Sequence, residues 1–147
     1  MKIQPKDYIP PKSNSIYVYK CTNNERFTFK RYIEYFNDDK IQVRYDNGIN
    51  SFINVYKYAD DGIKLCYYTN ISSYHQQFIN DEDCTNNYLI KEPLCENNLW
   101  ILSDGSKRCI TNKNAKVRTH LSYYNSAIEV TTISKNKSQF SVNYYVL

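Results

Sequence analysis

The sequence predicts an all-β protein, with mostly antiparallel strands in a strongly bent sheet or sandwich built from meander hairpins. Aromatic residues make up 16% of the chain, and 16 residues are tyrosine, which favours pleated, half-buried surfaces. Apolar and polar residues alternate with a period of two in several segments, and no segment keeps a 3.6-residue apolar period over three turns. Clusters of Asn and Asp separate these segments, as expected where only 3 glycines are present.

The first half of the chain is predicted to form an antiparallel meander. Asn37–Asp39, Asp46–Gly48 and Asp60–Gly62 are the turn signals between its strands. Asn47-Gly48 is typical of a type I′ hairpin, because both residues tolerate positive φ at the central positions of that turn. The expected strands are Ile16–Tyr19, Arg26–Phe36, Ile41–Tyr45, Ser51–Tyr58 and Ile63–Tyr68.

Alternation within two of these strands predicts which side chains face the core. In the third strand, Gln42 and Arg44 alternate with apolar residues in a clear period of two, which is typical of a strand. The apolar residues expected to share one face of the second strand are Phe27, Phe29, Ile33 and Tyr35, and those of the third strand are Ile41, Val43 and Tyr45.

The segment from Thr69 to Asn87 is the least regular part of the sequence. Tyr74–Phe78 is expected to form either a short strand or a helical turn. Asn80–Asn87 is polar and is expected to be an exposed loop. Its acidic residues, Asp81–Asp83, lack the glycine and the distal glutamate of a calcium loop, so a solvated loop is predicted there in place of a calcium site.

The second half carries the remaining strands and the only tryptophan. Trp100 lies in an apolar run beside the turn signal Ser103–Ser106, and we predict that its ring is buried. Asn112–Asn114 and Lys135–Lys137 are expected to be turns. The expected strands are Tyr88–Lys91, Leu99–Leu102, Lys107–Thr111, Lys116–Leu121, Ala127–Ser134 and Gln139–Leu147. The apolar side chains of the last strand are expected to be buried.

A single domain over residues 1–147 is expected, with 8–68 and 88–147 as two candidate related halves. Pro10 lies seven residues before Tyr17, and Pro93 lies seven residues before Trp100. Asn14 and Asn97 each follow the respective proline by four residues, and we predict positive φ at both. This repeated spacing is explained either by two related β-units or by chance in a chain rich in Tyr and Asn.

Charge and motifs exclude several function classes. The net charge is +4, and acidic and basic residues are intermixed, which argues against nucleic-acid binding. Met1–Pro11 has no apolar signal-peptide core, and no apolar run reaches the length of a transmembrane span. The glycine-rich motifs that hold nucleotide phosphates are missing, so no cofactor is expected.

The cysteines leave more than one interpretation open. None of the five forms a Cys-x-x-Cys pair, and the odd number leaves at least one unpaired within the chain. Most are expected to be buried or partly buried thiols, and a bridge between Cys84 and Cys95 is the alternative if the protein is secreted. Their connectivity cannot be read from the sequence; they are Cys21, Cys66, Cys84, Cys95 and Cys109.

No residue is predicted to be catalytic, cofactor-binding or metal-ligating. His75 and His120 lack the neighbours of a metal motif and are expected at the surface. Cys109 follows Lys107-Arg108, which would suit a cysteine-dependent enzyme, but in a strand Arg108 points to the opposite face. We therefore expect a protein that is not an enzyme.

Pairs of tyrosines are the most distinctive surface candidates. In a strand, each pair places one ring on each face. The outward ring could stack on sugars or bases, whereas the alternative is cross-strand packing. The pairs are Tyr67-Tyr68, Tyr123-Tyr124 and Tyr144-Tyr145.

Three motifs resemble uncharacterised extracytoplasmic or lipoprotein-type β domains of Gram-positive, spore-forming bacteria. Those domains share a Tyr-x-Pro opening, a central Lys-Glu-Pro-Leu motif followed by Trp, and a late Glu-Val-Thr-Thr strand. The matching residues here are Tyr8, Pro10, Tyr17 and Tyr19, then Lys91–Leu94, Trp100, Leu102 and Asp104, then Ile128–Thr132. The resemblance spans nearly the whole chain and implies a location in the cell envelope.

The chain also departs from that family. Asn14 and Asn97 replace family glycines. The family ends Asp-Tyr-Tyr-Ala-Pro-Gly-Val-Gly-Leu-Val-Lys, whereas this chain ends Asn143-Tyr-Tyr-Val-Leu147. The resemblance implies no catalytic residues. We expect a non-catalytic extracytoplasmic binding or structural module whose partner is a protein or an envelope component. The alternatives are a binder of small apolar ligands or carbohydrates in an aromatic-lined concavity and, third, a cysteine-dependent enzyme.

Overall fold

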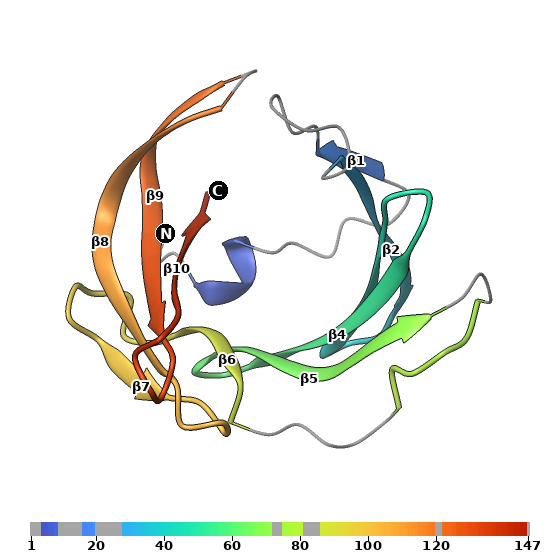
Figure 1. Cartoon of the computed structure of the whole chain (residues 1–147), viewed down its shortest axis with the longest axis horizontal. Helices are drawn as coiled ribbons and strands as arrows, with labels where there is room; N and C mark the ends of the chain where they lie inside the picture. The colour runs from blue at the N-terminus through green and yellow to red at the C-terminus, as the bar shows by residue number, and fades with distance from the viewer. Residues whose placement is uncertain are drawn as a thin grey trace. The chain divides into compact units, whose positions relative to one another are not determined.

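The computed structural model describes residues 4–8, 16–19, 28–71, 75–80, 86–119 and 122–146. The protein is all-β, as predicted, and its regular elements are antiparallel strands plus one short 3-10 helix (Figure 1). One sheet has the order β1-β2-β3-β4-β5-β6 and the other the order β10-β9-β8-β7. The elements are η1 (Pro5–Tyr8), β1 (Ile16–Tyr19), β2 (Phe29–Phe36), β3 (Lys40–Asp46), β4 (Ser51–Ala59), β5 (Gly62–Ile71), β6 (Tyr88–Lys91), β7 (Leu99–Ile101), β8 (Lys107–Arg118), β9 (Tyr123–Ile133) and β10 (Phe140–Tyr145).

The chain divides into two compact units. The β2–β5 unit comprises Pro11–Tyr58 and Lys64–Thr85, and the β7–β10 unit comprises Met1–Pro10, Ala59–Ile63 and Asn86–Leu147. The expectation of a single domain with related halves 8–68 and 88–147 stays a prediction.

The β2–β5 unit has a core on one face of its sheet, where Ile53, Val55, Cys66 and Ile79 are buried together. A β-bulge lies between Ile33 and Tyr35, so Tyr35 pairs with Gln42 and packs against this core. The prediction that Ile33 and Tyr35 share one face is therefore wrong, because the bulge inserts an extra residue and changes the alternation.

Strand β3 is buried on both faces, which the alternation did not predict. Gln42 is 0% exposed and Arg44 is 3% exposed, so both polar residues are buried although they alternate with apolar ones. The physical reason is a set of internal partners. The Gln42 amide donates to Glu34 Oε2 at 3.0 Å and to the Gln76 carbonyl at 2.7 Å, and Arg44 pairs with Glu34.

The hairpin between β3 and β4 is wider than a type I′ turn. Gly48 has φ 83°, but Asn47 is not among the non-glycine residues with positive φ in the described part of the chain. The Asn47 side-chain oxygen accepts the N–H groups of Ile49 and Asn50 at 3.0 and 2.7 Å. The prediction of positive φ at both central positions is therefore wrong, since the asparagine side chain organises a longer loop.

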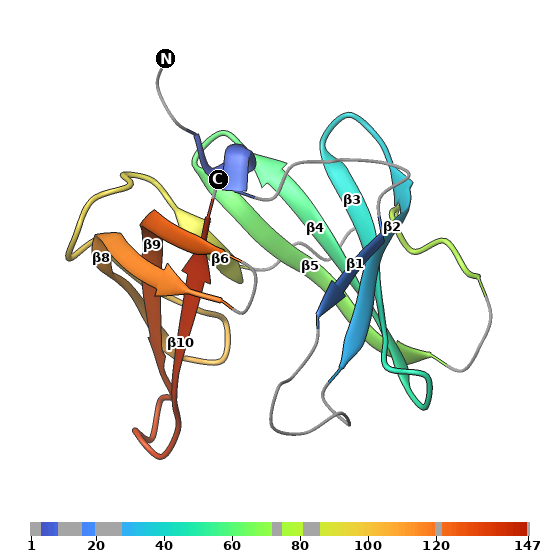
Figure 2. The same cartoon turned by 90° about the horizontal axis from the view of Figure 1, so that it is seen from above.

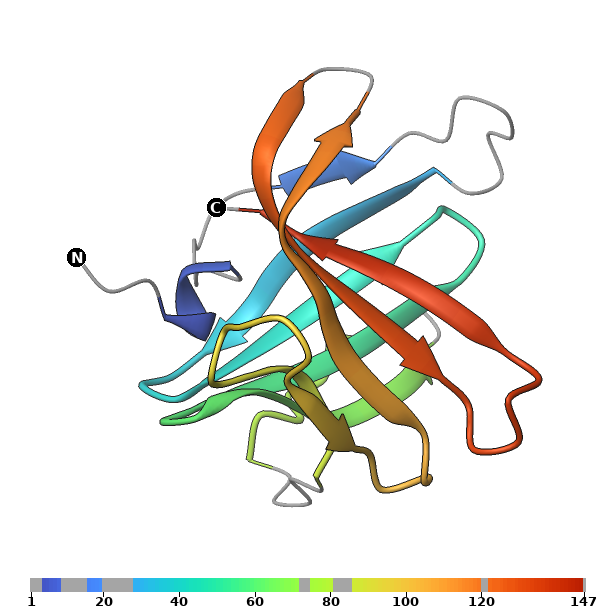
Figure 3. The same ribbon diagram turned by 90° about the vertical axis from the view of Figure 1, so that its left-hand side faces the viewer.

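The β7–β10 unit buries Trp100, Ile110 and Val130 on one face of its sheet, at 5%, 0% and 0% exposure. Burial of Trp100 is thus confirmed. Figure 3 shows the long, twisted β8–β9 hairpin that carries much of this face. The turn predicted at Asn112–Asn114 is wrong, because β8 continues through it and register shifts at Asn112 and Ala115 absorb the polar residues.

Strand β10 pairs antiparallel with β9, as predicted and as Figure 2 shows, but its apolar residues are not in the core. Phe140 and Tyr144 are 68% and 48% exposed. Their partners on β9 are Ile133 and Glu129, whereas Val130, which is buried, pairs with Asn143. The burial predicted for this strand is wrong because the register gives its polar residues to the buried face.

The remaining local predictions have mixed outcomes. Asn97 has φ 67°, as predicted. The described residues 75–78 form neither a strand nor a helical turn, so both alternatives for that segment are wrong. The predictions at Asn14, Phe27, His120, Cys21, Cys84 and Asp81–Asp83 lie outside the described residues.

Candidate interaction surface

The β7–β10 sheet carries large apolar side chains on the face opposite Trp100. Leu99 and Ile101 on β7 are 55% and 57% exposed, and Ile133 on β9 is 41% exposed. Phe140 on β10 is the most exposed of the set at 68%. We call this surface the exposed apolar face and define it by Leu99, Ile101, Ile133, Phe140, Val142 and Tyr144.

Strand register brings these side chains together, because residues directly opposite each other lie on the same face of a sheet. Lys107 pairs with Ile101 on one side and with Ile133 on the other, and Ile133 pairs with Phe140. Three apolar side chains from three strands therefore lie in one row with a single lysine.

A second row lies two residues along the strands. Cys109 pairs with Leu99 and Thr131, and Thr131 pairs with Val142. Cys109 is a free, half-buried thiol within this row. The row is apolar except for the Thr131 side chain, which is 8% exposed. The two rows together form a mostly apolar surface across all four strands of the sheet, interrupted by Lys107.

A third row, two residues further along the strands, contains Thr111, Glu129 and Tyr144 and forms a polar border of the exposed apolar face. The Thr111 hydroxyl lies 2.6 Å from Glu129 Oε1 and 3.1 Å from the Thr131 hydroxyl. A hydrogen bond with Glu129, together with the negative charge of that carboxylate, raises the pKa of the Tyr144 hydroxyl. Glu129 is therefore engaged on both sides, which holds the border in place.

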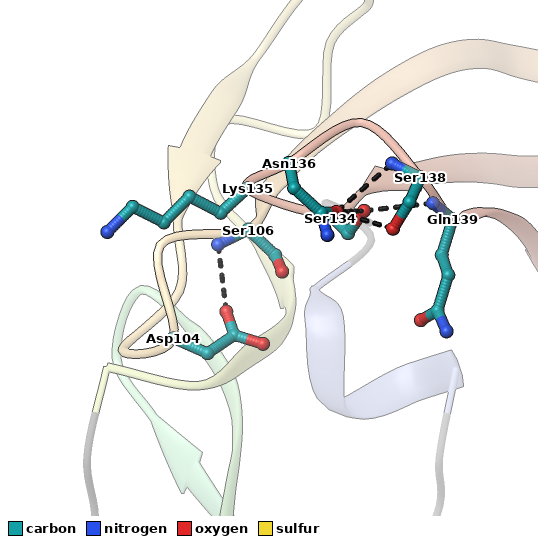
Figure 4. Close-up of a pocket in the computed structure, with 7 residues that line it drawn as sticks. All are labelled: Asp104, Ser106, Ser134, Lys135, Asn136, Ser138 and Gln139. Atoms are coloured by element: carbon teal, nitrogen blue, oxygen red, sulfur yellow. Dashed lines mark hydrogen bonds between the residues drawn. The ribbon is translucent and has the colours of Figure 1, made fainter.

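A polar pocket of about 620 Å³ borders the other end of the same strands (Figure 4). It lies between the β7–β8 turn and the β9–β10 turn. Asn136 Oδ1 accepts hydrogen bonds from the hydroxyls of Ser134 and Ser138 at 2.8 and 2.5 Å, so these groups mainly build the turn. The residues that line the pocket are Asp104, Ser106, Ser134, Lys135, Asn136, Ser138 and Gln139.

The two turns beside the pocket approach each other closely at Gly105. A Cβ atom at Gly105, where φ is 83°, would come within 2.9 Å of the Lys135 side chain. The backbone N–H of Ser106 donates to Asp104 Oδ1 at 2.8 Å, and the hydrogen bonds from Ser106 lower the pKa of Asp104. Asp104 therefore stays ionised and gives the rim of the apolar face a fixed negative charge.

The cysteines divide into bonded and free groups. Cys95 is a free, exposed thiol, so the alternative of a bridge between Cys84 and Cys95 is wrong. Cys66 is disulfide-bonded, and its partner lies outside the described residues. The interpretation of most cysteines as simple buried thiols therefore fails at Cys66. The sequence did not indicate a bridge at Cys66, because cysteine spacing does not give disulfide connectivity.

His75 is 69% exposed, as expected for a surface histidine, yet its ring is not isolated. Its Nδ1 lies 2.8 Å from Glu34 Oε1, and that carboxylate also pairs with Arg44. The Glu34 side chain is only 3% exposed. The bulge at Glu34 directs this carboxylate into the unit, and no pattern in the sequence indicates the bulge.

A row of aromatic rings crosses β2 to β5. Tyr45 and Phe52 stack with centroids 4.7 Å apart and planes 6° apart. The ring centroid of Phe29 lies 5.8 Å from that of Tyr45, and the ring centroid of Tyr68 lies 5.9 Å from that of Phe52. We call these four residues the aromatic row. Tyr67, by contrast, stacks on Phe78 at 4.9 Å, so the Tyr67-Tyr68 pair does place one ring on each side, as predicted.

The described residues contain no group of three or more His, Cys, Asp or Glu side chains placed to hold a metal ion. Among those residues, no helix is long and apolar enough to cross a membrane. Comparisons of the chain with known protein families, curated proteins and solved structures gave no match. The resemblance to envelope domains stays a prediction, and the chain's own geometry is what bears on function.

Proposed function

We propose that this protein is a non-catalytic extracytoplasmic binding or structural module of the cell envelope, which holds a partner protein or envelope component on the exposed apolar face. The observation that carries the proposal is the row formed by Ile101, Ile133 and Phe140, which the strand register places side by side. These residues are 57%, 41% and 68% exposed. Contiguous apolar surface with a polar rim is the usual anatomy of a protein interaction site.

The surroundings of the face support a binding role. Lys107 lies within the row, Glu129 lies at one border, and the serine-lined pocket lies at the other end. Such polar groups fix the orientation of a partner, while the apolar centre supplies most of the affinity. The opposite face of the sheet is packed, because it buries Trp100 and Ile110. A preformed surface loses little conformational entropy when a partner binds.

Two observations support the extracytoplasmic part of the proposal. Cys66 is disulfide-bonded, and disulfides persist mainly in oxidising compartments outside the cytoplasm. The motifs of the sequence resemble those of envelope domains. Fractionation of the source cells, with Cys66 tested for a disulfide after rapid alkylation, checks this. Recovery in the cytoplasm with Cys66 reduced would overturn it.

The binding proposal is tested by co-sedimentation of the purified protein with isolated cell walls and with membrane vesicles from the same cells. The double variant Ile101→Lys, Ile133→Lys places charges in the centre of the row and should lower retention at least about tenfold, which equals roughly 1.4 kcal/mol. Tyr123→Lys is the matched control, because Tyr123 is 55% exposed on the same sheet but outside the exposed apolar face. Equal retention of both variants and wild type would overturn the proposal.

The aromatic row supports a second candidate function, the binding of small apolar ligands or carbohydrates. Tyr45 connects the row to a polar chain, because its hydroxyl lies 3.1 Å from that of Tyr56, which accepts from Asn54 Nδ2 at 2.6 Å. Asn54 Oδ1 is buried and has no hydrogen-bond partner in the described part of the structure. An unpaired buried acceptor beside aromatic rings suits a ligand hydroxyl.

The stacking geometry weighs against this second candidate as the main function. Tyr45 and Phe52 cover each other's faces and therefore present mainly their edges, which is also what cross-strand packing produces. Titration with soluble oligosaccharides, followed by tyrosine fluorescence, tests the candidate. Saturable quenching that Tyr68→Ala abolishes would favour it, and its absence would leave the row as packing.

A thiol titration tests the third alternative, a cysteine-dependent enzyme. Cys95 and Cys109 are the free thiols among the described residues. A reactive nucleophile is recognised by rapid alkylation below neutral pH. Alkylation at the rate of an ordinary thiol would support the non-catalytic proposal, whereas one fast-reacting site would overturn it.

A further inference from the structure

The open edge of β10 has a definite hydrogen-bonding direction. The Ser134 N–H donates to the Gln139 carbonyl at 3.1 Å, which makes these two residues a bonded pair next to β10. Bonded and non-bonded pairs alternate along an antiparallel ladder. Phe140 is the next residue of β10, and it lies opposite Ile133. The residues of β10 whose backbone groups form no hydrogen bonds with β9 are therefore Phe140, Val142 and Tyr144. Their N–H and C=O groups point to the open edge.

The same alternation of bonded and non-bonded pairs occurs between β7 and β8, at the other edge of the sheet. Ile110 N–H donates to the Asn98 carbonyl at 3.0 Å, and Leu102 N–H donates to the Ser106 carbonyl at 2.8 Å. Leu99 and Ile101 lie between these bonded positions, in the register given by their pairs on β8. The alternation therefore holds in this sheet, and it supports the assignment made for β10.

Strand β10 lacks the devices by which proteins protect an edge. Its sequence, Phe-Ser-Val-Asn-Tyr-Tyr, contains no charge and no proline. Its pairing with β9 runs without a register shift, so no bulge turns the edge away. In the order β10-β9-β8-β7, β10 is the terminal strand of the described sheet. Such an edge is a template for another strand.

The side chains at this edge are symmetric about Val142. Phe140 lies two residues before it and Tyr144 two residues after it, and all three project onto the exposed apolar face. Antiparallel pairing of two identical strands about a two-fold axis at Val142 places Val142 opposite Val142. It also places Phe140 of one copy opposite Tyr144 of the other, and aromatic pairs of this kind stabilise sheets.

We propose that β10 pairs with β10 of a second copy of this chain, joining the two four-stranded sheets into one continuous sheet across a two-fold axis at Val142. Every outward N–H and C=O of Phe140, Val142 and Tyr144 then meets a partner in the other copy. The exposed apolar faces of the two copies become one surface. This inference rests on the edge of β10 and stands independently of the envelope partner proposed above.

A foreign extended peptide could use the same backbone groups. The symmetry of the edge favours a second copy, because an identical strand repeats the aromatic–valine–aromatic order in the antiparallel direction. Isologous two-fold contacts are also the commonest form of association in soluble oligomers.

Sedimentation velocity of the full chain over a range of concentrations tests the inference. Wild type should reach twice the 17.5 kDa of one copy as concentration rises. Val142→Pro removes an N–H that β9 does not use, keeps an apolar side chain of similar size, and should leave the protein monomeric. Ile133→Lys is the matched control and should still dimerise, because it alters the face without altering the edge. Trp100 emission verifies that each variant is folded.

Cysteine cross-linking provides a second readout in a background with Cys95→Ser and Cys109→Ser. Val142→Cys should form an intermolecular disulfide on mild oxidation, because the two sulfur atoms meet at the axis. Ser141→Cys should not, since it lies opposite Asn143 of the other copy. A wild type that stays monomeric, or a Val142→Pro variant that dimerises equally well, overturns the inference. A monomer whose retention on cell walls is lost in Val142→Pro would assign the edge to a foreign strand and also overturn it.

Discussion

Trp100 donates its indole N–H to the backbone carbonyl of Tyr88 at 3.0 Å, and this bond connects β7 to β6. The same oxygen accepts from Arg108 Nη1 at 2.8 Å. Trp100 and Tyr88 are 5% and 7% exposed, so the bonds lie within the core of the β7–β10 unit. The indole therefore contributes both apolar burial and a buried hydrogen bond.

Replacing Trp100 separates these two contributions. Trp100→Phe keeps an aromatic ring and should cost about 1–2 kcal/mol, because the Tyr88 carbonyl retains Arg108 as a donor. Trp100→Ala should cost about 3–5 kcal/mol, since it also leaves a cavity. Urea denaturation followed by circular dichroism gives both values. A native emission maximum as red as that of free tryptophan would contradict the burial itself.

Asn97 provides a test of backbone conformation. Its φ of 67° lies in the left-handed region, which asparagine and glycine tolerate and β-branched residues do not. Asn97→Gly should change the free energy of unfolding by less than about 0.5 kcal/mol, whereas Asn97→Val should cost at least about 1–2 kcal/mol. Lys137, with φ 59°, is a matched position where glycine should stabilise the protein. If Asn97→Val melts like wild type, positive φ at this site has no energetic consequence.

The fold class, most strands and the burial of Trp100 could be predicted because they depend on local periodicity and turn residues. Which face of β10 is buried could not, since both of its faces carry large side chains and the register with β9 decides between them. The exposed apolar face was missed for the same reason. Apolar residues at alternate positions of Gln139–Leu147 indicate a strand with one apolar face. They do not indicate whether that face packs on the core.

The buried polar residues are the second part that the sequence did not show. Gln42 and Arg44 have the spacing of solvent-facing residues, and only a bulge in the neighbouring strand places Glu34 beside them. Neither the bulge nor the segment 75–80, which supplies the Gln76 carbonyl, has a sequence signature that fixes its position. Long-range contacts of this kind follow from tertiary structure and not from local propensity.

Stability should fall at alkaline pH, and Tyr88 should contribute to this. Burial, and then the hydrogen bond to Asp61, raise the pKa of Tyr88 from 10.0 to about 12. A raised folded-state pKa means that the unfolded chain loses this proton first, so stability declines as pH rises from 10.0 through about 12. Tyr88→Phe should show a shallower decline than wild type in urea midpoints measured across that range. A Tyr88→Phe variant whose decline is as steep as that of wild type would contradict the assignment.

The disulfide at Cys66 should contribute more to the free energy of unfolding than the burial of the Cys66 side chain alone. Cys66 is 7% exposed and packs with Ile53, Val55 and Ile79. Reduction should lower the free energy of unfolding by about 2–4 kcal/mol, because it releases a constraint on the unfolded chain. Cys66→Ala should reproduce this loss and should remove the sensitivity to reductant. Cys109→Ser, at a free thiol, should remain sensitive, and a Cys66→Ala variant that still responds to reductant would locate the effect elsewhere.

The buried pair of Glu34 and Arg44 gives the sharpest test of the β2–β5 unit. Their side chains are 3% and 4% exposed, and Gln42 and His75 also bind the Glu34 carboxylate. Glu34→Gln removes the carboxylate that pairs with the buried Arg44 guanidinium, so the variant should lose about 3–5 kcal/mol. Glu34→Leu combined with Arg44→Met removes both charges and should cost clearly less than the sum of the two single changes.

The surface pair of Asp39 and Lys57 is the matched control for this cycle. Its atoms lie 3.3 Å apart, but the side chains are 48% and 38% exposed. Asp39→Asn should therefore cost no more than about 1 kcal/mol, because water screens the charges and solvates whichever partner remains. Urea denaturation at one pH of Glu34→Gln, Glu34→Leu, Arg44→Met, the double variant and Asp39→Asn measures the two effects side by side. If Glu34→Gln costs as little as Asp39→Asn, the Arg44 guanidinium must reach solvent or another carboxylate, and the buried network described here does not hold the sheet together.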